Sequence, residues 1–181
     1  MYTQEEITGA FGPFTAPAVF DNSYIQNCIA EIAEFPSALK AFTDMLTTEQ
    51  QMSTYRPGSW TFRQVIHHIA DSHMQAYSRF KLALTESDPV IKPYIQNAWA
   101  ETPDATGVDA GVSAALITPL HQRWVYLMRS MSEADFSKQY IHPEYGKTFS
   151  LAYACGLYAW HGKHHLEQMK RYAENMGWIK A

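Results

Sequence analysis

Apolar residues recur at intervals of three and four along most of this chain, a spacing that places side chains on one face of an α-helix. Four long segments show the pattern, at about residues 21–46, 60–84, 109–131 and 150–177. The apolar positions of the first segment are Ile25, Cys28, Ile29, Ile32, Phe35, Leu39, Phe42 and Leu46. No segment alternates like a β-strand over a useful length. The pattern therefore predicts an all-α protein built as a bundle of four helices.

The segments between these helices carry turn and breaker residues. Residues 1–20 hold prolines, glycines and phenylalanines and predict an extended arm, which leaves residues 21–181 as a single bundle domain. Ser59 follows a turn signal and is expected to cap the second helix. Pro36 should kink or split the first helix and Pro119 should bend the third. Residues 132–149 predict a short turn of helix and then an irregular loop.

The connection from Asp88 to Val108 is the longest break between helices. It contains three prolines, and a connection of this length inside a compact domain is usually functional. Its aromatic residues, Tyr94 and Trp99, are candidates to lie over a site. We expect the connection to act as a lid whose prolines limit its conformations.

Histidines supply the candidate chemistry. Six of the eight fall in two short windows: His67, His68, His73, His161, His164 and His165. His161 and His165 are four residues apart, so they share one helix face with about 6 Å of rise between them. A third imidazole from the helix at 60–84 would complete three neutral donors and leave coordination positions open, as in catalytic metal sites. Periodicity favours His68 over His67 only slightly, and the alternative is that the histidines merely pack in the core.

Other classes of metal site fit the sequence poorly. Carboxylate-bridged di-metal bundles need Glu-x-x-His pairs, which this chain lacks. Zincin proteases need His-Glu-x-x-His, and here Gly162 stands where the glutamate would be. A bound haem would not explain why His161 and His165 are spaced four residues apart. Imidazole ligands suit Zn, Ni, Cu and Fe, so three histidines binding one divalent ion is the remaining arrangement.

The composition indicates which partners and which cellular compartment suit this chemistry. The chain has 181 residues, of which 46% are hydrophobic and 18% charged, and its net charge is −4. No block of like charge invites nucleic acid or an anionic membrane. Cys28 and Cys155 form no disulfide framework, the first residues do not resemble a signal peptide, and no apolar run reaches the ~18 residues of a membrane span. We therefore expect a cytoplasmic protein, with a homodimer as one alternative for its assembly.

Several motifs resemble the DinB-like (YfiT-like) superfamily in order and spacing. They are Gly58–His73, Arg79–Glu86, Lys92–Tyr94 with Ala98–Trp99, His121–Trp124, and Gly156–His165. The resemblance covers about residue 50 to the C-terminus and carries nothing over for the N-terminal arm. It implies an antiparallel four-helix bundle with one Zn or Ni ion. It also implies that the ligands are His68, His161 and His165.

The chemistry implied by the resemblance is open between two reactions on a small-molecule substrate. Members are described as metal-dependent hydrolases, and relatives transfer or isomerise with low-molecular-weight thiols such as bacillithiol or mycothiol. In both cases the metal lowers the pKa of a bound nucleophile, either water or thiol. We favour thiol transfer because no carboxylate base for attack by water is evident, although Asp71, Glu101 and Tyr94 remain catalytic candidates. A non-catalytic metal- or ligand-binding bundle is the alternative from another class.

Three further side chains are candidates to line the pocket. They are Arg63 on the second helix, Trp99 in the long connection and Trp124 on the third helix. Each has a simpler role available, because buried tryptophans commonly fill cores and an arginine near a helix start commonly lies at the surface.

Overall fold

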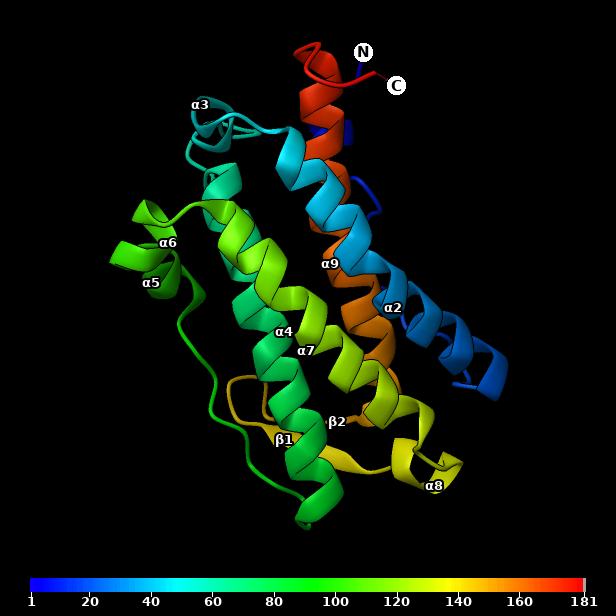
Figure 1. Cartoon of the computed structure of the whole chain (residues 1–181). Helices are drawn as coiled ribbons and strands as arrows, with labels where there is room; N and C mark the ends of the chain where they lie inside the picture. Colours follow the sequence, from blue (N-terminus) through cyan, green and yellow to red (C-terminus); the bar gives the residue numbers. More distant parts are fainter. Residues whose placement is uncertain (181) are drawn as a thin grey trace.

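The computed structural model describes residues 1–180, and four long helices dominate it (Figure 1). They are α2 (Asn22–Met45), α4 (Phe62–Thr85), α7 (Ala110–Arg129) and α9 (Leu151–Asn175). The predicted all-α four-helix bundle is confirmed, and each helix lies close to its predicted range.

The order of the helices around the bundle differs from their order in the chain. Helices α2 and α4 each pack on both α7 and α9, so α2 and α4 lie diagonally opposite each other. Helix α4 runs antiparallel to α9, and α2 runs antiparallel to α7, whereas α4 and α7 point the same way (Figure 1). This parallel pair needs a connection that returns along the whole bundle. The long segment after α4 provides it.

Each long helix begins at a residue whose side chain caps it. Asp21, Thr61, Asp109 and Ser150 accept hydrogen bonds from backbone N–H groups of the first turn. Thr61 therefore caps α4, and the expectation for Ser59 was wrong: the Ser59 hydroxyl instead donates to the backbone carbonyl of Arg56 at 2.9 Å.

The prolines inside α2 and α7 do not interrupt either helix. Pro36 lies within α2 and Pro119 within α7, and both helices continue past them. The expected split at Pro36 is therefore absent. Packing of a long helix against two neighbours outweighs the one backbone hydrogen bond that a proline removes.

The core consists of two apolar clusters stacked along the bundle axis. One contains Trp124, Phe80 and Ile29, and the other contains Phe42 and Phe62. On α4, α7 and α9, histidines occupy the positions between the residues of the two clusters. A buried polar layer therefore crosses the middle of the bundle.

A β-hairpin closes the end of the bundle where α9 begins. Strands β1 (Gln139–His142) and β2 (Lys147–Ser150) pair antiparallel, with His142 opposite Lys147. The prediction of an irregular loop here was wrong, because strands of four residues are too short to show an alternating pattern. The turn between them uses Gly146 at a φ of 59°, a conformation that favours glycine.

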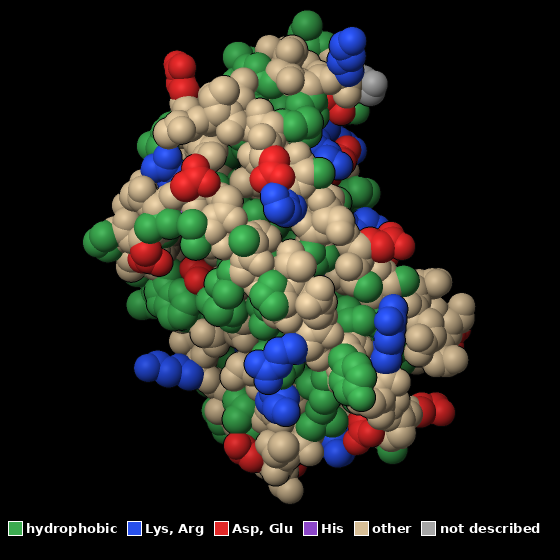
Figure 2. All heavy atoms as spheres, in the orientation of Figure 1, with side chains coloured by type: hydrophobic (Ala, Val, Ile, Leu, Met, Phe, Trp, Pro, Cys, Tyr) green, Lys and Arg blue, Asp and Glu red, His purple; other side chains and the backbone are tan. Residues whose placement is uncertain are grey.

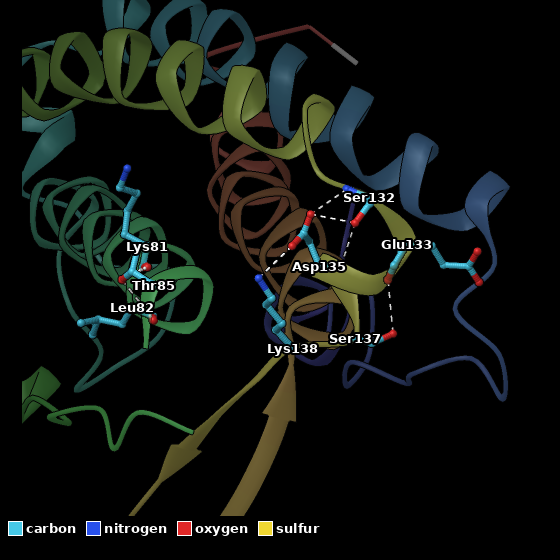
Figure 3. A network of polar contacts seen from close by, with 8 residues as sticks. All are labelled: Lys81, Leu82, Thr85, Ser132, Glu133, Asp135, Ser137 and Lys138. Atoms are coloured by element: carbon cyan, nitrogen blue, oxygen red, sulfur yellow. Dashed lines mark hydrogen bonds and ion pairs between the residues drawn. The ribbon is translucent and has the colours of Figure 1, made fainter. Parts of the chain in front are cut away.

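A short helix and backbone hydrogen bonds hold the hairpin in place. Helix α8 (Glu133–Phe136) precedes it and is closed by a reciprocal cap between Ser132 and Asp135 (Figure 3). Lys138 forms an ion pair with Asp135 at 2.9 Å. The Ile91 amide donates to the Ile141 carbonyl, which attaches the long connection to β1. The hairpin is thereby fixed beside α4 and α9.

Four more short helices lie outside the bundle: α1 (Gln4–Thr8), α3 (Thr48–Gln51), α5 (Gln96–Ala100) and α6 (Pro103–Gly107). Helix α1 corrects the prediction that the whole N-terminal arm is extended, since five residues are too few to show a helical period. The rest of the arm follows α9, where the Phe14 ring lies 5.3 Å from the Tyr153 ring.

Neither a membrane-spanning helix in the described part of the chain nor a surface patch of one charge sign on the face drawn in Figure 2 is seen. Among residues 1–180, none of the helices combines the length and the apolar character needed to cross a bilayer. On the face drawn in Figure 2, charged side chains of both signs are scattered among apolar and polar ones, and histidines are not visible there.

Candidate metal centre

Three histidines from two antiparallel helices meet in the polar layer of the bundle. His68 comes from α4, and His161 and His165 come from α9. One ring nitrogen from each lies within 4.8 Å of the others. The Nε2 atoms of His68 and His161 are 3.2 Å apart. Three imidazole nitrogens at this separation can bind one small cation, and their spacing suits a first-row divalent metal.

Burial keeps these imidazoles neutral. It lowers the pKa of His68 to about 4 and that of His165 to about 3. It also holds the pKa of His161 well below the ordinary value for histidine. A histidine binds a metal only through an unprotonated nitrogen, so the environment presents all three in the form that coordination needs at neutral pH. The donor set therefore fits a bound divalent ion.

A contact with the N-terminal arm fixes the orientation of His165. The Gln168 side chain donates from Nε2 to the Thr8 carbonyl at 2.6 Å. Its Oε1 atom lies 3.2 Å from His165 Nδ1 and must accept a hydrogen bond there. His165 therefore carries its proton on Nδ1 and leaves Nε2 free. Such outer contacts orient metal ligands. No pattern in the sequence indicates that the arm takes part, because Thr8 contributes only a backbone carbonyl.

A chain of two further histidines fixes His161 in the same way. His121 Nδ1 lies 2.7 Å from the Ile32 carbonyl, which can only accept, so Nδ1 carries the proton. His121 Nε2 then accepts from His73 Nδ1 at 2.8 Å, and His73 Nε2 accepts from His161 Nδ1 at 3.3 Å. Burial lowers the pKa values of His73 and His121, which keeps both rings neutral. His161 is left with a free Nε2 facing His68.

Removing the far end of this chain should weaken metal binding without destroying the site. We expect the His121→Ala variant to lose roughly 10- to 100-fold in metal affinity, the usual effect of an outer hydrogen bond to a ligand. Titration against a competing chelator measures the change, and saturating metal should still give one ion per chain.

His67→Ala is the matched control for this prediction. His67 is also buried on α4, but its Nδ1 bonds Ser113 Oγ at 2.7 Å and its Nε2 bonds the Val108 carbonyl at 3.0 Å. It therefore lies outside the chain of histidines and should leave the affinity unchanged. Equal affinities in wild type and His121→Ala would contradict the orienting role.

A cavity of about 600 Å³ opens beside the three histidines. Its walls come from α4, α9, the long connection and the β-hairpin. Besides the histidines, they include Ser72, Arg79, Tyr94, Tyr140, Lys147 and Tyr158. We call this space the site cavity. Its volume suits a small-molecule substrate.

The long connection covers the site cavity in part. Pro93, Tyr94 and Gln96 line it, and burial raises the pKa of Tyr94. The Tyr94 hydroxyl is buried without a hydrogen-bond partner. Trp99 does not line the cavity: it packs against Tyr94 with ring centroids 4.5 Å apart and supports that side chain from outside.

Two other expected pocket residues lie elsewhere. Arg63 donates to the Thr106 carbonyl at 3.0 Å, between α4 and α6. Trp124 is fully buried in the core, with its ring 6.0 Å from that of His73. Neither lines the site cavity, so both expectations were wrong. The cause is the rotation of α4 and α7 about their axes, which sequence spacing alone does not fix.

The carboxylates considered as bases do not line the site cavity either. Glu101 accepts a hydrogen bond from Gln64 at 3.2 Å. Asp71 is half-buried, and burial together with Asp104 raises its pKa. At the position of a zincin glutamate, a Cβ on Gly162 would lie 2.9 Å from the Phe35 ring, so this position faces α2. Among residues 1–180, the carboxylate that lines the cavity is the exposed Glu144 of the hairpin turn.

The arrangement of the helices agrees with comparisons to known proteins. The family model described as the DinB superfamily matches residues 31–169. The chain belongs to the DinB superfamily. This confirms the resemblance seen in the sequence motifs.

Relatives from bacilli match nearly the whole chain. A Bacillus mycoides protein is 44% identical over 92% of this chain and 95% of its own length. A Bacillus licheniformis protein is 40% identical over 96% of this chain and 99% of its own length. Both carry the name "Putative metal-dependent hydrolase". The solved structure of YfiT from Bacillus subtilis, described as "a probable metal-dependent hydrolase with an unusual four-helix bundle topology", matches with a TM-score of 0.93. The two chains are 37% identical, and the match covers 96% of this chain and 99% of YfiT. The metal dependence in these names accords with the three-histidine cluster.

Proposed function

We propose that this protein is a metal-dependent enzyme whose His68, His161 and His165 hold one Zn or Ni ion. The observation that carries the proposal is the convergence of three neutral imidazoles, two of them oriented by hydrogen bonds, in the wall of a cavity large enough for a small molecule. Three histidines leave coordination positions open, as catalytic sites require. When bound, the ion would supply the Lewis acidity that makes a water or a thiol nucleophilic at neutral pH.

Within this class, we propose the transfer of a small cellular thiol to an electrophile. Hydrolysis needs a residue to take a proton from water, but Asp71 and Glu101 do not line the site cavity, and Gly162 offers no side chain for this role. Tyr94 does face it, but burial raises the pKa of its hydroxyl, which therefore stays protonated. It can donate to an anion or carbonyl but cannot take a proton from water. A thiol depends less on a protein base to lose its proton, because its pKa is far below that of water.

The second candidate function is hydrolysis, and the names of the bacillar relatives favour it. In this case Tyr94 would orient the substrate carbonyl, and the exposed Glu144 would be the available base. The third alternative, a bundle that binds a metal or ligand without catalysis, predicts neither reaction.

One experiment distinguishes the three candidate functions. Metal-loaded and metal-stripped protein are incubated with a small thiol and a generic electrophile, and thiol consumption is followed. A parallel set omits the thiol and measures ester and amide hydrolysis. We expect conjugation only in the loaded form, with loss in His161→Ala and retention in His67→Ala. Robust hydrolysis without thiol would support the hydrolase, and the absence of both reactions in loaded protein would support a binding role.

A further inference from the structure

Arg79 is a buried cation at the wall of the site cavity. Its side chain lies on α4, and the residue is 8% exposed. The guanidinium donates to the Tyr158 hydroxyl at 3.0 Å and lies 5.9 Å from the centre of the Tyr140 ring. Its Nε atom is buried without a hydrogen-bond partner. The groups around this charge are therefore phenols, which cannot neutralise it.

Among residues 1–180, no carboxylate lies within ion-pair distance of this charge. The ion pairs of this part of the chain join other residues, and Arg79 takes part in none of them. Burial raises the pKa values of Tyr140 and Tyr158, so both phenols remain neutral. A buried charge without a partner is costly and is rarely retained for stability. Among the described residues, the carboxylate that lines the cavity, Glu144, is exposed on the hairpin turn and forms no ion pair with Arg79. A bound anion would supply the missing partner.

We propose that Arg79 binds a carboxylate of the substrate while the reacting group of the same molecule lies at the three histidines. The planar guanidinium offers a fork of N–H donors that matches a carboxylate, and Nε is one edge of that fork. Lys147, which also lines the cavity from the exposed hairpin, adds positive charge on the path of an entering anion. The substrate class is thus a small organic acid that also carries the reacting thiol or acyl group.

The helix geometry sets the length of this substrate. Arg79 follows His68 by eleven residues on α4, which corresponds to about 16 Å of rise. Both side chains lean toward the N-terminus of the helix, but that of Arg79 is the longer, so the guanidinium lies somewhat closer to the His68 ring than the backbone rise. A molecule with five or six bonds between its carboxylate and its reacting atom spans much of this distance.

The inference rests on the proposed function, and a pair of matched probes tests it. The probes are 6-mercaptohexanoate and 6-mercaptohexanol, which differ only in the charged end. Binding to metal-loaded protein is measured by calorimetry. We expect the acid to bind at least tenfold more tightly than the alcohol. We expect the preference to vanish in Arg79→Gln and to fall to an intermediate value in Arg79→Lys, which keeps the charge but not the fork.

Arg63→Gln is the control, because Arg63 is equally buried on α4 but bonds the Thr106 carbonyl outside the cavity. It should keep the full preference. Melting temperatures separate a binding role from a structural one: loss of an uncompensated charge should leave Arg79→Gln at least as stable as the wild type.

The outcomes also separate this inference from the metal proposal. If the wild-type protein takes up no metal and still prefers the acid, the Arg79 site is supported and the metal function is overturned. Equal binding of acid and alcohol by protein containing one ion per chain would overturn the Arg79 site alone. Loss of the preference in Arg63→Gln as well would also overturn it.

Discussion

Replacing His161 or His165 with alanine is expected to abolish tight binding of Zn or Ni. Each removes one of three converging nitrogens, and His68→Ala should weaken binding strongly for the same reason. If the ligands share the free energy typical of a histidine-rich zinc site, each loss weakens binding roughly a thousandfold. Elemental analysis of protein purified without chelator, followed by a chelator titration, measures the effect.

The other histidines supply the controls for this prediction. His164 lies on the same turn of α9 but packs on Trp160, with ring centroids 4.5 Å apart, and His142 lies on the hairpin. His164→Ala and His142→Ala should retain one ion per chain. The ligand assignment fails if the His161→Ala, His165→Ala double variant still binds metal in stoichiometric amount.

Metal-free protein should lose several kcal/mol of stability between pH 7 and pH 5. Burial depresses the pKa values of His68 and His121 to about 4 and that of His165 to about 3, all below the unfolded value of 6.5. As the pH falls through 6.5, the unfolded chain takes up protons that the folded protein excludes, so the balance shifts toward unfolding. Each of these histidines contributes a loss of roughly 2 kcal/mol by pH 5.

Urea unfolding of chelator-treated protein at pH 7, 6 and 5 tests this dependence. The His121→Gln variant removes one of the excluded protons, so its stability should fall less steeply with pH than that of the wild type. Added metal should raise stability at pH 7 by binding only the folded form. A stability that stays constant from pH 7 to pH 5 would show that these histidines are not buried as neutral rings.

The sequence alone determined the features that depend on local spacing. The helical period gave four helices near their observed bounds, because a face of apolar residues is visible within each segment. The four-residue separation of His161 and His165 placed both rings on one face of α9 for the same reason. The motif resemblance chose His68, and the structure brings it next to them. Short elements escaped prediction: α1 and the β-hairpin have too few residues to show a period.

Only the tertiary structure decided which side chains share the site. His67 and His68 are neighbours in sequence, but one turns toward Ser113 on α7 and the other toward His161 on α9. Arg63 and Arg79 are both arginines of α4, yet only Arg79 reaches the site cavity. These choices depend on how far each helix is rotated about its axis and on which helices become neighbours. Those quantities are set by the packing of the whole core, including the diagonal placement of α2 and α4, and no single segment of the sequence records them.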